Sequence, residues 1–385
     1  MKTRNFSDDR MRLGLFWPSA RTMHWTSKAV ADRNPDVMDL AVHIEIAKLI
    51  EDIGLDYAFL ADRYSPYTPA STRVGHQDPC ILAYLWGAAI ASHTRHIGII
   101  TTIHTTYLHP AHVARIGANL DVMSAGRWGM NIVTGFTANE QQLFGHEGLV
   151  DHTERYALAD ELISAVKELW RADEDIEFAG EALRFRGHLS GPRPVQQPWP
   201  LLVNAGASPS GQRFAVRQCD YVFTVGNDAS QVSQLAGNLD EQAAEVDRKG
   251  EVLPMISVMP LIRDSQAEAE DEMAWISANI DTEAARAFAV SLTGGIKTYT
   301  ETYKDVDEAV LLDTIGNGAG LFRIAGTPEQ VAEQMADLYE NSKAGGMLLS
   351  FPFWSPSEIG RMGDVLAILE KSGSWSHPKN AGWSW

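Results

Sequence analysis

The sequence contains only two cysteines, Cys80 and Cys219, among 385 residues. Neither lies in a Cys-x-x-C pair or in a Cys/His spacing suited to zinc, and two thiols are too few for a disulfide framework. This scarcity excludes a disulfide-stapled scaffold and is typical of a cytoplasmic protein with reduced thiols. We therefore expect no metal site.

Basic residues are also scarce, because 32 Lys and Arg stand against 50 Asp and Glu and give a net charge of −18. A protein that follows nucleic-acid phosphates needs clustered cations, and no such cluster occurs. No run of about 18 apolar residues is present, and the polar N-terminus lacks the apolar core of a signal peptide. We therefore expect no nucleic-acid partner, no membrane span and a cytoplasmic location.

Short runs rich in β-branched and aromatic residues predict eight strands, at 12–17, 56–60, 97–102, 128–133, 201–205, 221–225, 255–262 and 346–351. Amphipathic helical stretches separate most of them. One has an apolar face over 46–53 and stops at Gly54, and another begins with a capping box at Thr327. Apolar strands that alternate with helices predict an α/β fold, a closed (β/α)₈ barrel, with an open doubly wound sheet as the alternative.

Three segments are longer than barrel connections need: 17–39, 172–199 and 265–325. The second holds a possible hairpin around Gly180. The third is rich in glycine, a composition that suits a hinged lid and fits a plain surface excursion equally well. We expect one barrel domain over 1–372 with a lid insertion at about 265–325. The tryptophan-rich tail at 373–385 is more typical of an interaction arm than of a core element.

Polar residues close several predicted strands, where a barrel of this kind carries its catalytic groups. They include Asp62 and Arg63, Thr102 and His104, Asn131 and Asn204, and aromatic residues follow the last strand. Aromatic walls with a few polar groups describe a pocket for a flat, amphipathic ligand. Asn131 is the strongest of these candidates, because a buried amide is costly without hydrogen-bond partners.

The loop NAGASPSG at 204–211 lies between a predicted strand and a predicted helix. Glycine, serine and exposed backbone N–H groups at the start of a helix can bind an anion, because the N–H groups and the helix dipole favour negative charge. The same residues can also form an ordinary turn with Ser208 as an N-cap. The loop alone leaves both interpretations open.

The stretch TTYLHPAHVARIGANLDVMSAGRWGMN at 105–131, continued by IVTGFTANE, resembles the bacterial-luciferase-like two-component FMN monooxygenases. The segments RLGLFWP, HTERYALADEL and GGMLLSF extend this resemblance over most of the chain. It is similar to alkanesulfonate, nitrilotriacetate and dibenzothiophene-sulfone monooxygenases, and most of all to pyrimidine monooxygenase. Asp62-Arg63 departs from the aliphatic-plus-lysine pair expected in the pyrimidine enzyme, so uracil is not the expected substrate.

The resemblance implies a luciferase-like TIM barrel with reduced FMN across its mouth and O₂ as co-substrate. It assigns catalytic roles to Thr102 and Asn131 at the flavin edge. It further implies that the cofactor is bound by Asp62, Arg63, Thr102, Asn131, Glu140, Arg155, Tyr156, Gly206 and Ser208. We expect the substrate to contact His24, Trp25, His104, Phe351 and Trp354.

The resemblance also implies an FMNH₂-dependent monooxygenase that works through a flavin peroxide, at C4a or N5. Its substrate would be a small organic molecule such as an N-heterocycle, amide or sulfone, with ring opening or group displacement. A separate NAD(P)H:flavin reductase is the expected partner, because the chain shows no G-x-G-x-x-G fingerprint, and a homodimer or homotetramer is expected. The alternatives are an F420-dependent oxidoreductase of the same superfamily and a non-catalytic flavin-binding protein.

Overall fold

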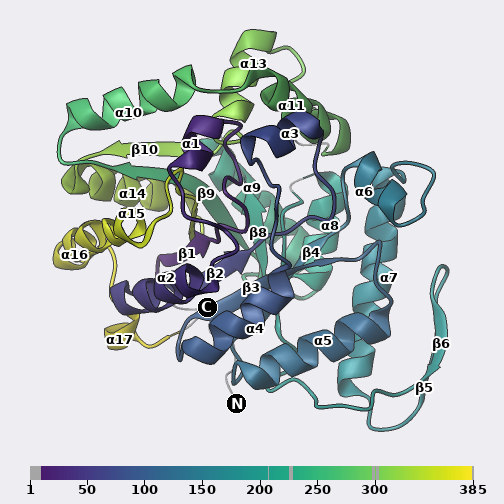
Figure 1. Cartoon of the computed structure of the whole chain (residues 1–385). Helices are drawn as coiled ribbons and strands as arrows, with labels where there is room; N and C mark the ends of the chain where they lie inside the picture. The colour runs from purple at the N-terminus through teal and green to yellow at the C-terminus, as the bar shows by residue number, and fades with distance from the viewer. Residues whose placement is uncertain (1–9, 207, 225–228, 297–299, 301–302, 384–385) are drawn as a thin grey trace.

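The computed structural model describes residues 10–206, 208–224, 229–296, 300 and 303–383, in which eight parallel strands close into a barrel (Figure 1). The ring closes because β9 pairs with both β8 and β11, and β1 pairs with both β11 and β2. Its strands are β1 (Arg12–Phe16), β2 (Tyr57–Leu60), β3 (Gly98–His104), β4 (Trp128–Val133), β7 (Leu201–Asn204), β8 (Tyr221–Thr224), β9 (Leu253–Ile262) and β11 (Gly346–Leu349). The closed ring confirms the (β/α)₈ prediction and removes the open-sheet alternative.

Helices follow the strands and cover the outside of the ring (Figure 1). They are α2 (Leu40–Ile53), α4 (Ala83–His93), α5 (Pro110–Met123), α7 (His152–Arg171), α8 (Pro209–Gln218), α9 (Ala229–Ala244), α14 (Pro328–Ser342) and α16 (Met362–Ser372). Local sequence fixes their ends. The predicted capping box is present, because Thr327 and Gln330 exchange hydrogen bonds at the start of α14. Gly54 ends α2 with a φ of 96°, which favours glycine.

The period of two along each strand separates an inner from an outer core. Tyr57 and Phe59 of β2 face the inside of the ring, whereas Ala58 and Leu60 pack against the helices outside. Tyr57 has room because its neighbour across the sheet is Gly14. A Cβ at Gly14 would lie 2.0 Å from the Tyr57 ring. Bulky side chains therefore fill the barrel below its mouth.

The segment between β9 and α14 carries three described helices and one strand. The helices α10 (Gln266–Ala278), α11 (Thr282–Gly295) and α13 (Glu308–Gly316) lie at the same end of the barrel as α1 (Lys28–Asp32) and α3 (Pro69–Val74) (Figure 1). The strand β10 (Phe322–Gly326) pairs in parallel with the end of β9. The sequence did not predict β10, which lies inside the expected lid insertion.

The hairpin expected in 172–199 is confirmed, whereas the C-terminal tail differs from the expected arm. The predicted hairpin is present as β5 (Ile176–Ala179) and β6 (Arg184–Gly187), which pair in an antiparallel manner. The tail is not a free arm, because Trp375 is 4% exposed and belongs to the main apolar cluster. It packs over Gly54, where a Cβ would come within 3.0 Å of the Trp375 ring. A short helix, α17 (Pro378–Ala381), follows.

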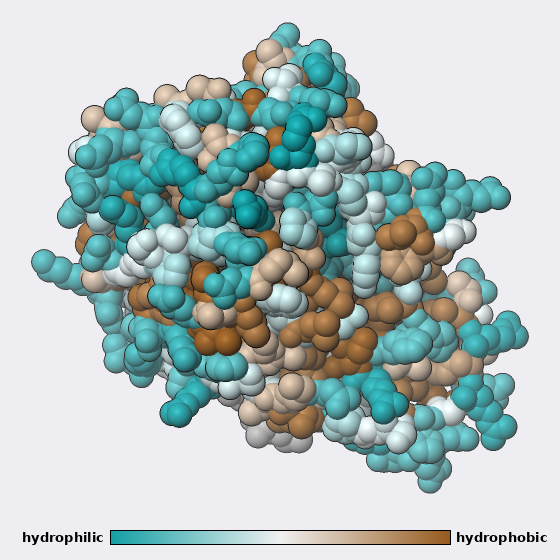
Figure 2. All heavy atoms as spheres, in the orientation of Figure 1, coloured by the Kyte–Doolittle hydropathy of each residue, from teal (hydrophilic) through white to brown (hydrophobic). Residues whose placement is uncertain are grey.

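Apolar side chains form a band on the face that carries α2, α4 and α5, whereas the insertion helices are largely hydrophilic on that face (Figure 2). Exposed members include Leu85 of α4 and Val122 and Met123 of α5. Among the described residues, no helix is both long enough and apolar enough to span a membrane.

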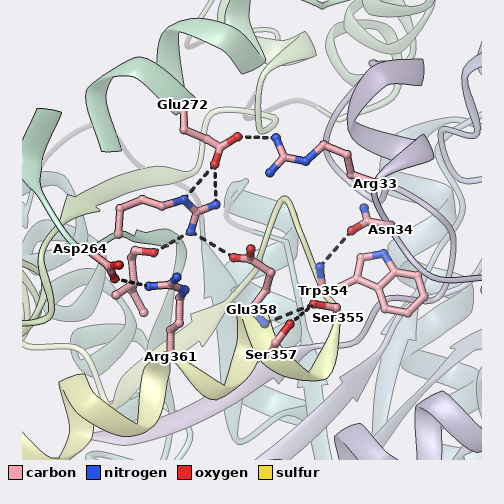
Figure 3. Close-up of polar contacts among 11 residues, drawn as sticks. Arg33, Asn34, Asp264, Glu272, Trp354, Ser355, Ser357, Glu358 and Arg361 are labelled. Carbon is pink, nitrogen blue, oxygen red and sulfur yellow. Dashed lines mark hydrogen bonds and ion pairs between the residues drawn. The ribbon is translucent and has the colours of Figure 1, made fainter. Parts of the chain in front are cut away.

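An ion-pair network joins the first insertion helix to the barrel (Figure 3). Arg263, just after β9, lies 2.8 Å from Glu272 of α10 and 3.0 Å from Glu358 of α15 (Pro356–Gly360). Arg33, at the end of α1, also pairs with Glu272. The side chains of Arg263 and Glu272 are only 10% and 16% exposed, so water screens them less than it screens surface pairs.

We expect Arg263→Ala to lower the free energy of unfolding by about 1.5–3 kcal/mol, because two largely buried carboxylates lose a charged donor. Arg286→Ala is the matched control, since Arg286 pairs with Glu308 on the surface, and it should change stability by less than about 0.5 kcal/mol. Chemical denaturation measures both. Equal effects of the two substitutions would contradict a structural role for this network.

Candidate active site

A cavity of about 230 Å³ lies at the carboxyl ends of the barrel strands. Thr102 and Asn131 line its barrel side, because they occupy inward positions at the ends of β3 and β4. Phe288 and Leu292 of α11 line the opposite side, which belongs to the insertion. The cavity therefore has a polar half built by the barrel and an apolar half built by the insertion.

Thr102 and Asn131 are register partners on adjacent strands and share a buried hydrogen bond. The Thr102 hydroxyl donates to the carbonyl of Leu60 at 2.9 Å, and it accepts from Nδ2 of Asn131 at 2.9 Å. Oδ1 of Asn131 is buried and has no partner among the described residues. Because a buried polar atom without a partner is costly, this amide is arranged for a group that enters the cavity.

Asp62 and His104 form a second buried pair on the cavity wall. The two side chains are 2% and 3% exposed, and His104 Nε2 lies 2.7 Å from Asp62 Oδ1. The other carboxylate oxygen accepts from the backbone N–H of Ala83 at 2.8 Å. Burial lowers the pKa of His104, but the hydrogen bond and the negative charge of Asp62 outweigh burial, and the net pKa is raised. A proton on Nε2 is therefore held against Asp62.

Arg63 and Glu140, the two other charged residues of the wall, are held by the protein. Arg63 lies over the ring of Tyr67, with 3.6 Å between the guanidinium carbon and the ring centroid. Its guanidinium nitrogens donate to Ser65, Gln77 and Thr137. Glu140 accepts a hydrogen bond from the backbone N–H of Tyr64 at 2.7 Å. Asp62 and Arg63, although adjacent in sequence, thus contact different groups.

A second hollow, of about 130 Å³, adjoins the cavity and shares Val133, Phe136, Ala205 and Ile296 with it. Its lining brings together four of the predicted cofactor-binding residues, Arg155, Tyr156, Gly206 and Ser208. Burial lowers the pKa of Arg155 and raises the pKa of Tyr156 to about 12, so at neutral pH the guanidinium is charged and the phenol is neutral.

The start of α8 forms one wall of this second hollow. Ser208 is the N-cap, and its hydroxyl accepts from the backbone N–H of Gly211. A Cβ at Gly206 would lie 2.1 Å from the hydroxyl of Tyr156, so only glycine fits beside that side chain. In the described part of the 204–211 loop, Ser208 is therefore an N-cap, as one of the two sequence interpretations expects, and Gly206 fits closely beside Tyr156.

The predicted substrate residues fall into two groups. His24 and His104 line the cavity, and His24 shares a hydrogen bond with Ser350 at 2.8 Å. Trp25, Phe351 and Trp354 line a separate hollow of about 10 Å³. Trp354 is held there because its indole N–H donates to the carbonyl of Arg21. This placement corrects the expectation that these three aromatic residues wall the substrate cavity.

The sequence interpretation missed the apolar half of the cavity. Ala285, Phe288, Ala289 and Leu292 follow the i, i+3, i+4, i+7 spacing of a buried helix face and pack together. This spacing was visible in the sequence, but the glycines and polar residues around it indicated a loop. This side of the wall is completed from separate segments by Met23, Tyr67 and Leu321. No local sequence pattern predicts that these residues line the cavity.

The residues present fit a flat cofactor that carries a phosphate. The adjoining hollows offer a charged guanidinium and a helix N-terminus at one end and a buried amide with an unpartnered oxygen at the other. Among residues 10–206, 208–224, 229–296, 300 and 303–383, no cluster of three His, Cys, Asp or Glu could hold a metal ion.

The luciferase-like monooxygenase family model matches residues 11–344. The chain belongs to this family. Nitrilotriacetate monooxygenase component A of Aminobacter aminovorans is 26% identical, over 87% of this chain and 86% of the relative. Dibenzothiophene-sulfone monooxygenase of Rhodococcus erythropolis (strain XP) is 28% identical, over 94% and 93%. A riboflavin lyase structure with modified FMN and riboflavin has a TM-score of 0.87 at 25% identity, over 96% and 93%. Both the family resemblance and the barrel are confirmed.

We expect Asp62→Asn to lower the pKa of His104 below its ordinary value of 6.5, because burial then acts without the carboxylate that outweighs it. NMR titration of the imidazole measures this change. The raised pKa in the wild type adds stability below the unfolded pKa, and that contribution is lost as pH rises through the folded pKa. His24, whose pKa is lowered to about 3 by burial, is the internal control. An unchanged His104 pKa would refute the coupling.

Proposed function

We propose that this protein is an FMNH₂-dependent monooxygenase that inserts one oxygen atom of O₂ into a small organic substrate. The observation that carries this proposal is the pair of adjoining hollows, one suited to a phosphate and one lined by a polar barrel half. Membership of the luciferase-like monooxygenase family supports it independently. When bound, reduced FMN would supply the two electrons that reduce the second oxygen atom to water.

The flavin would lie across the barrel mouth with its phosphate at the start of α8. Arg155 and Ser208 would bind the phosphate, because a guanidinium and a helix N-terminus both favour a dianion. Tyr156 and Gly206 would shape that end of the site. The isoalloxazine would then occupy the larger cavity beside Asp62, Arg63 and Glu140.

Thr102 and Asn131 would act where O₂ reacts, but in different ways. The single Thr102 proton is given to the carbonyl of Leu60, so Thr102 accepts from Asn131 and fixes the orientation of the amide. The Nδ2 atom of Asn131 has a second hydrogen, which would donate to a group in the cavity. We therefore assign Asn131 as the donor to developing negative charge and Thr102 as the residue that orients it.

The rival functions are less well supported. A deazaflavin-dependent hydride-transfer enzyme would share the fold, but both curated relatives named above are monooxygenases. A non-catalytic flavin-binding protein would not need the buried Thr102–Asn131 pair. Oxygen uptake and product analysis together separate the three functions. A monooxygenase consumes O₂ with reduced FMN and substrate and forms an oxygenated product, whereas the other two proteins form no such product.

We further propose that a separate NAD(P)H:flavin reductase supplies FMNH₂ and that the protein works in the cytoplasm as a homodimer or homotetramer. The free thiols of Cys80 and Cys219 agree with that location, and the exposed apolar residues of α4 and α5 agree with self-association. The insertion at about 265–325 would close the cavity as a lid over the barrel domain 1–372, since α11 supplies its outer wall.

We expect Arg155→Ala to weaken FMN binding about tenfold or more, because a charged hydrogen bond to phosphate contributes about 1.5–3 kcal/mol. Equilibrium flavin titration measures this. Arg171→Ala is the matched control, since Arg171 lies at the other end of α7 and contacts the Trp199 ring. If both variants bind FMN like the wild type, the phosphate lies elsewhere.

We expect Asn131→Leu to retain FMN but to lower product formation by about 10²–10³, the usual cost of losing one preorganised donor. Thr102→Val should also lower product formation, but less, because it removes only the hydroxyl that orients the Asn131 amide. The readout is the ratio of product to hydrogen peroxide at equal FMNH₂ oxidation. Thr101→Val is the control, since Thr101 faces outward and bonds to Trp128. Normal coupling in both cavity variants would move the oxygen site away from β3 and β4.

A further inference from the structure

The cavity side formed by the insertion is apolar. Phe288 and Leu292 of α11 are 2% and 4% exposed, and Leu321 and Met23 continue the same wall. With the flavin ring against the polar barrel half, this apolar wall is what a substrate would contact. Apolar and aromatic walls favour ligands that give up little hydration when they are buried.

The charges on the described part of the cavity wall are all engaged with the protein itself. The His104 imidazole bonds to the carboxylate of Asp62, and Glu140 is bonded by the backbone of Tyr64. The Arg63 guanidinium lies over the Tyr67 ring, and its nitrogens donate hydrogen bonds to three oxygen atoms. Two acidic groups thus stand against one guanidinium and one imidazole, so the described wall carries no excess positive charge to offset a bound anion.

Removing a carboxylate or sulfonate from water without a counter-charge is expensive, whereas a neutral carbonyl, sulfone or ring nitrogen needs only a hydrogen bond. The wall provides neutral partners of that kind. His24 is half-buried and shares a hydrogen bond with Ser350, and Ser257, in the middle of β9, also lines the cavity. Recognition by these residues does not require a charged ligand.

We propose that the substrate is an uncharged, largely aromatic molecule that packs against the α11 face. Carboxylate-bearing molecules are then poor ligands, even though polycarboxylate and neutral aromatic substrates both occur in the names of the relatives. This inference rests on the proposed monooxygenase function and adds the substrate class to it.

The test measures binding of matched probes to the FMN-loaded protein by flavin absorbance. The neutral probes are dibenzothiophene sulfone and acridone, and each is paired with a derivative that carries one added carboxylate. Nitrilotriacetate is the polyanionic probe. We expect at least one neutral probe to bind at least about tenfold more tightly than its carboxylated partner and than nitrilotriacetate. Equal or tighter binding of the anions, or no binding of either neutral probe, would overturn the inference.

Two substitutions on one helix locate the effect. Leu292→Lys should weaken the binding of neutral probes about tenfold or more, because it adds a cation to the apolar wall. The preference for neutral over carboxylated probes should then shrink or reverse. Val290→Lys, at a position that is 64% exposed on the same helix, should leave the preference unchanged. Leu292→Gln serves as a second variant if the lysine prevents folding, and it should weaken neutral probes without favouring anions. An unchanged preference in the folded Leu292 variants would overturn the inference.

Flavin binding and product formation keep this test separate from that of the function. Loss of FMN binding by the wild type, or no oxygenated product with any probe that binds, would count against the monooxygenase proposal. Normal FMN binding with product formed from a carboxylated probe in preference to its neutral partner would count only against the substrate class.

Discussion

Closure of the parallel ring is the constraint on which the site depends. Once β9 pairs with both β8 and β11, alternate residues of every strand must face the inside. The register then sets Thr102 directly beside Asn131. Because Tyr57 fills the space opposite Gly14 lower in the barrel, the inward residues at the carboxyl ends are the ones left to build a cavity. Barrel closure therefore decides which of two adjacent threonines, Thr101 or Thr102, can take part in chemistry.

The sequence was sufficient for the barrel because its signals are local. Each strand is a short run rich in apolar residues, and caps such as Thr327 and Gly54 mark the helix ends. It was insufficient for β10 and Trp375, whose structure depends on distant partners. The strand β10 is a short segment that pairs with an overhanging end of β9, and Trp375 is buried because α2 ends in a glycine turn beneath it. Neither partner is visible from the local pattern.

The structure places most of the predicted strand-end residues on the cavity wall, but their side-chain partners do not follow from their order in the sequence. Asp62 and Arg63 are adjacent in sequence, but successive residues of an extended segment point to opposite sides. Asp62 therefore meets His104, which stands two residues after Thr102 and shares its inward direction. Arg63 turns to the ring of Tyr67 instead. Aromatic residues after β11 were assigned to the cavity by position alone, and the indole N–H of Trp354 holds that side chain elsewhere.

The two halves of the cavity obey different physical requirements. The proposed oxygen chemistry needs a donor that is held in place before charge develops, and the strand pair that carries Thr102 and Asn131 would provide it. Recognition needs a surface that can change in shape and polarity without disturbing that donor. The insertion provides that surface, because α11 contacts the cavity through side chains such as Leu292 while its backbone hydrogen bonds stay within the helix. A substitution on α11 can therefore alter which molecule enters while the barrel geometry at β3 and β4 is retained.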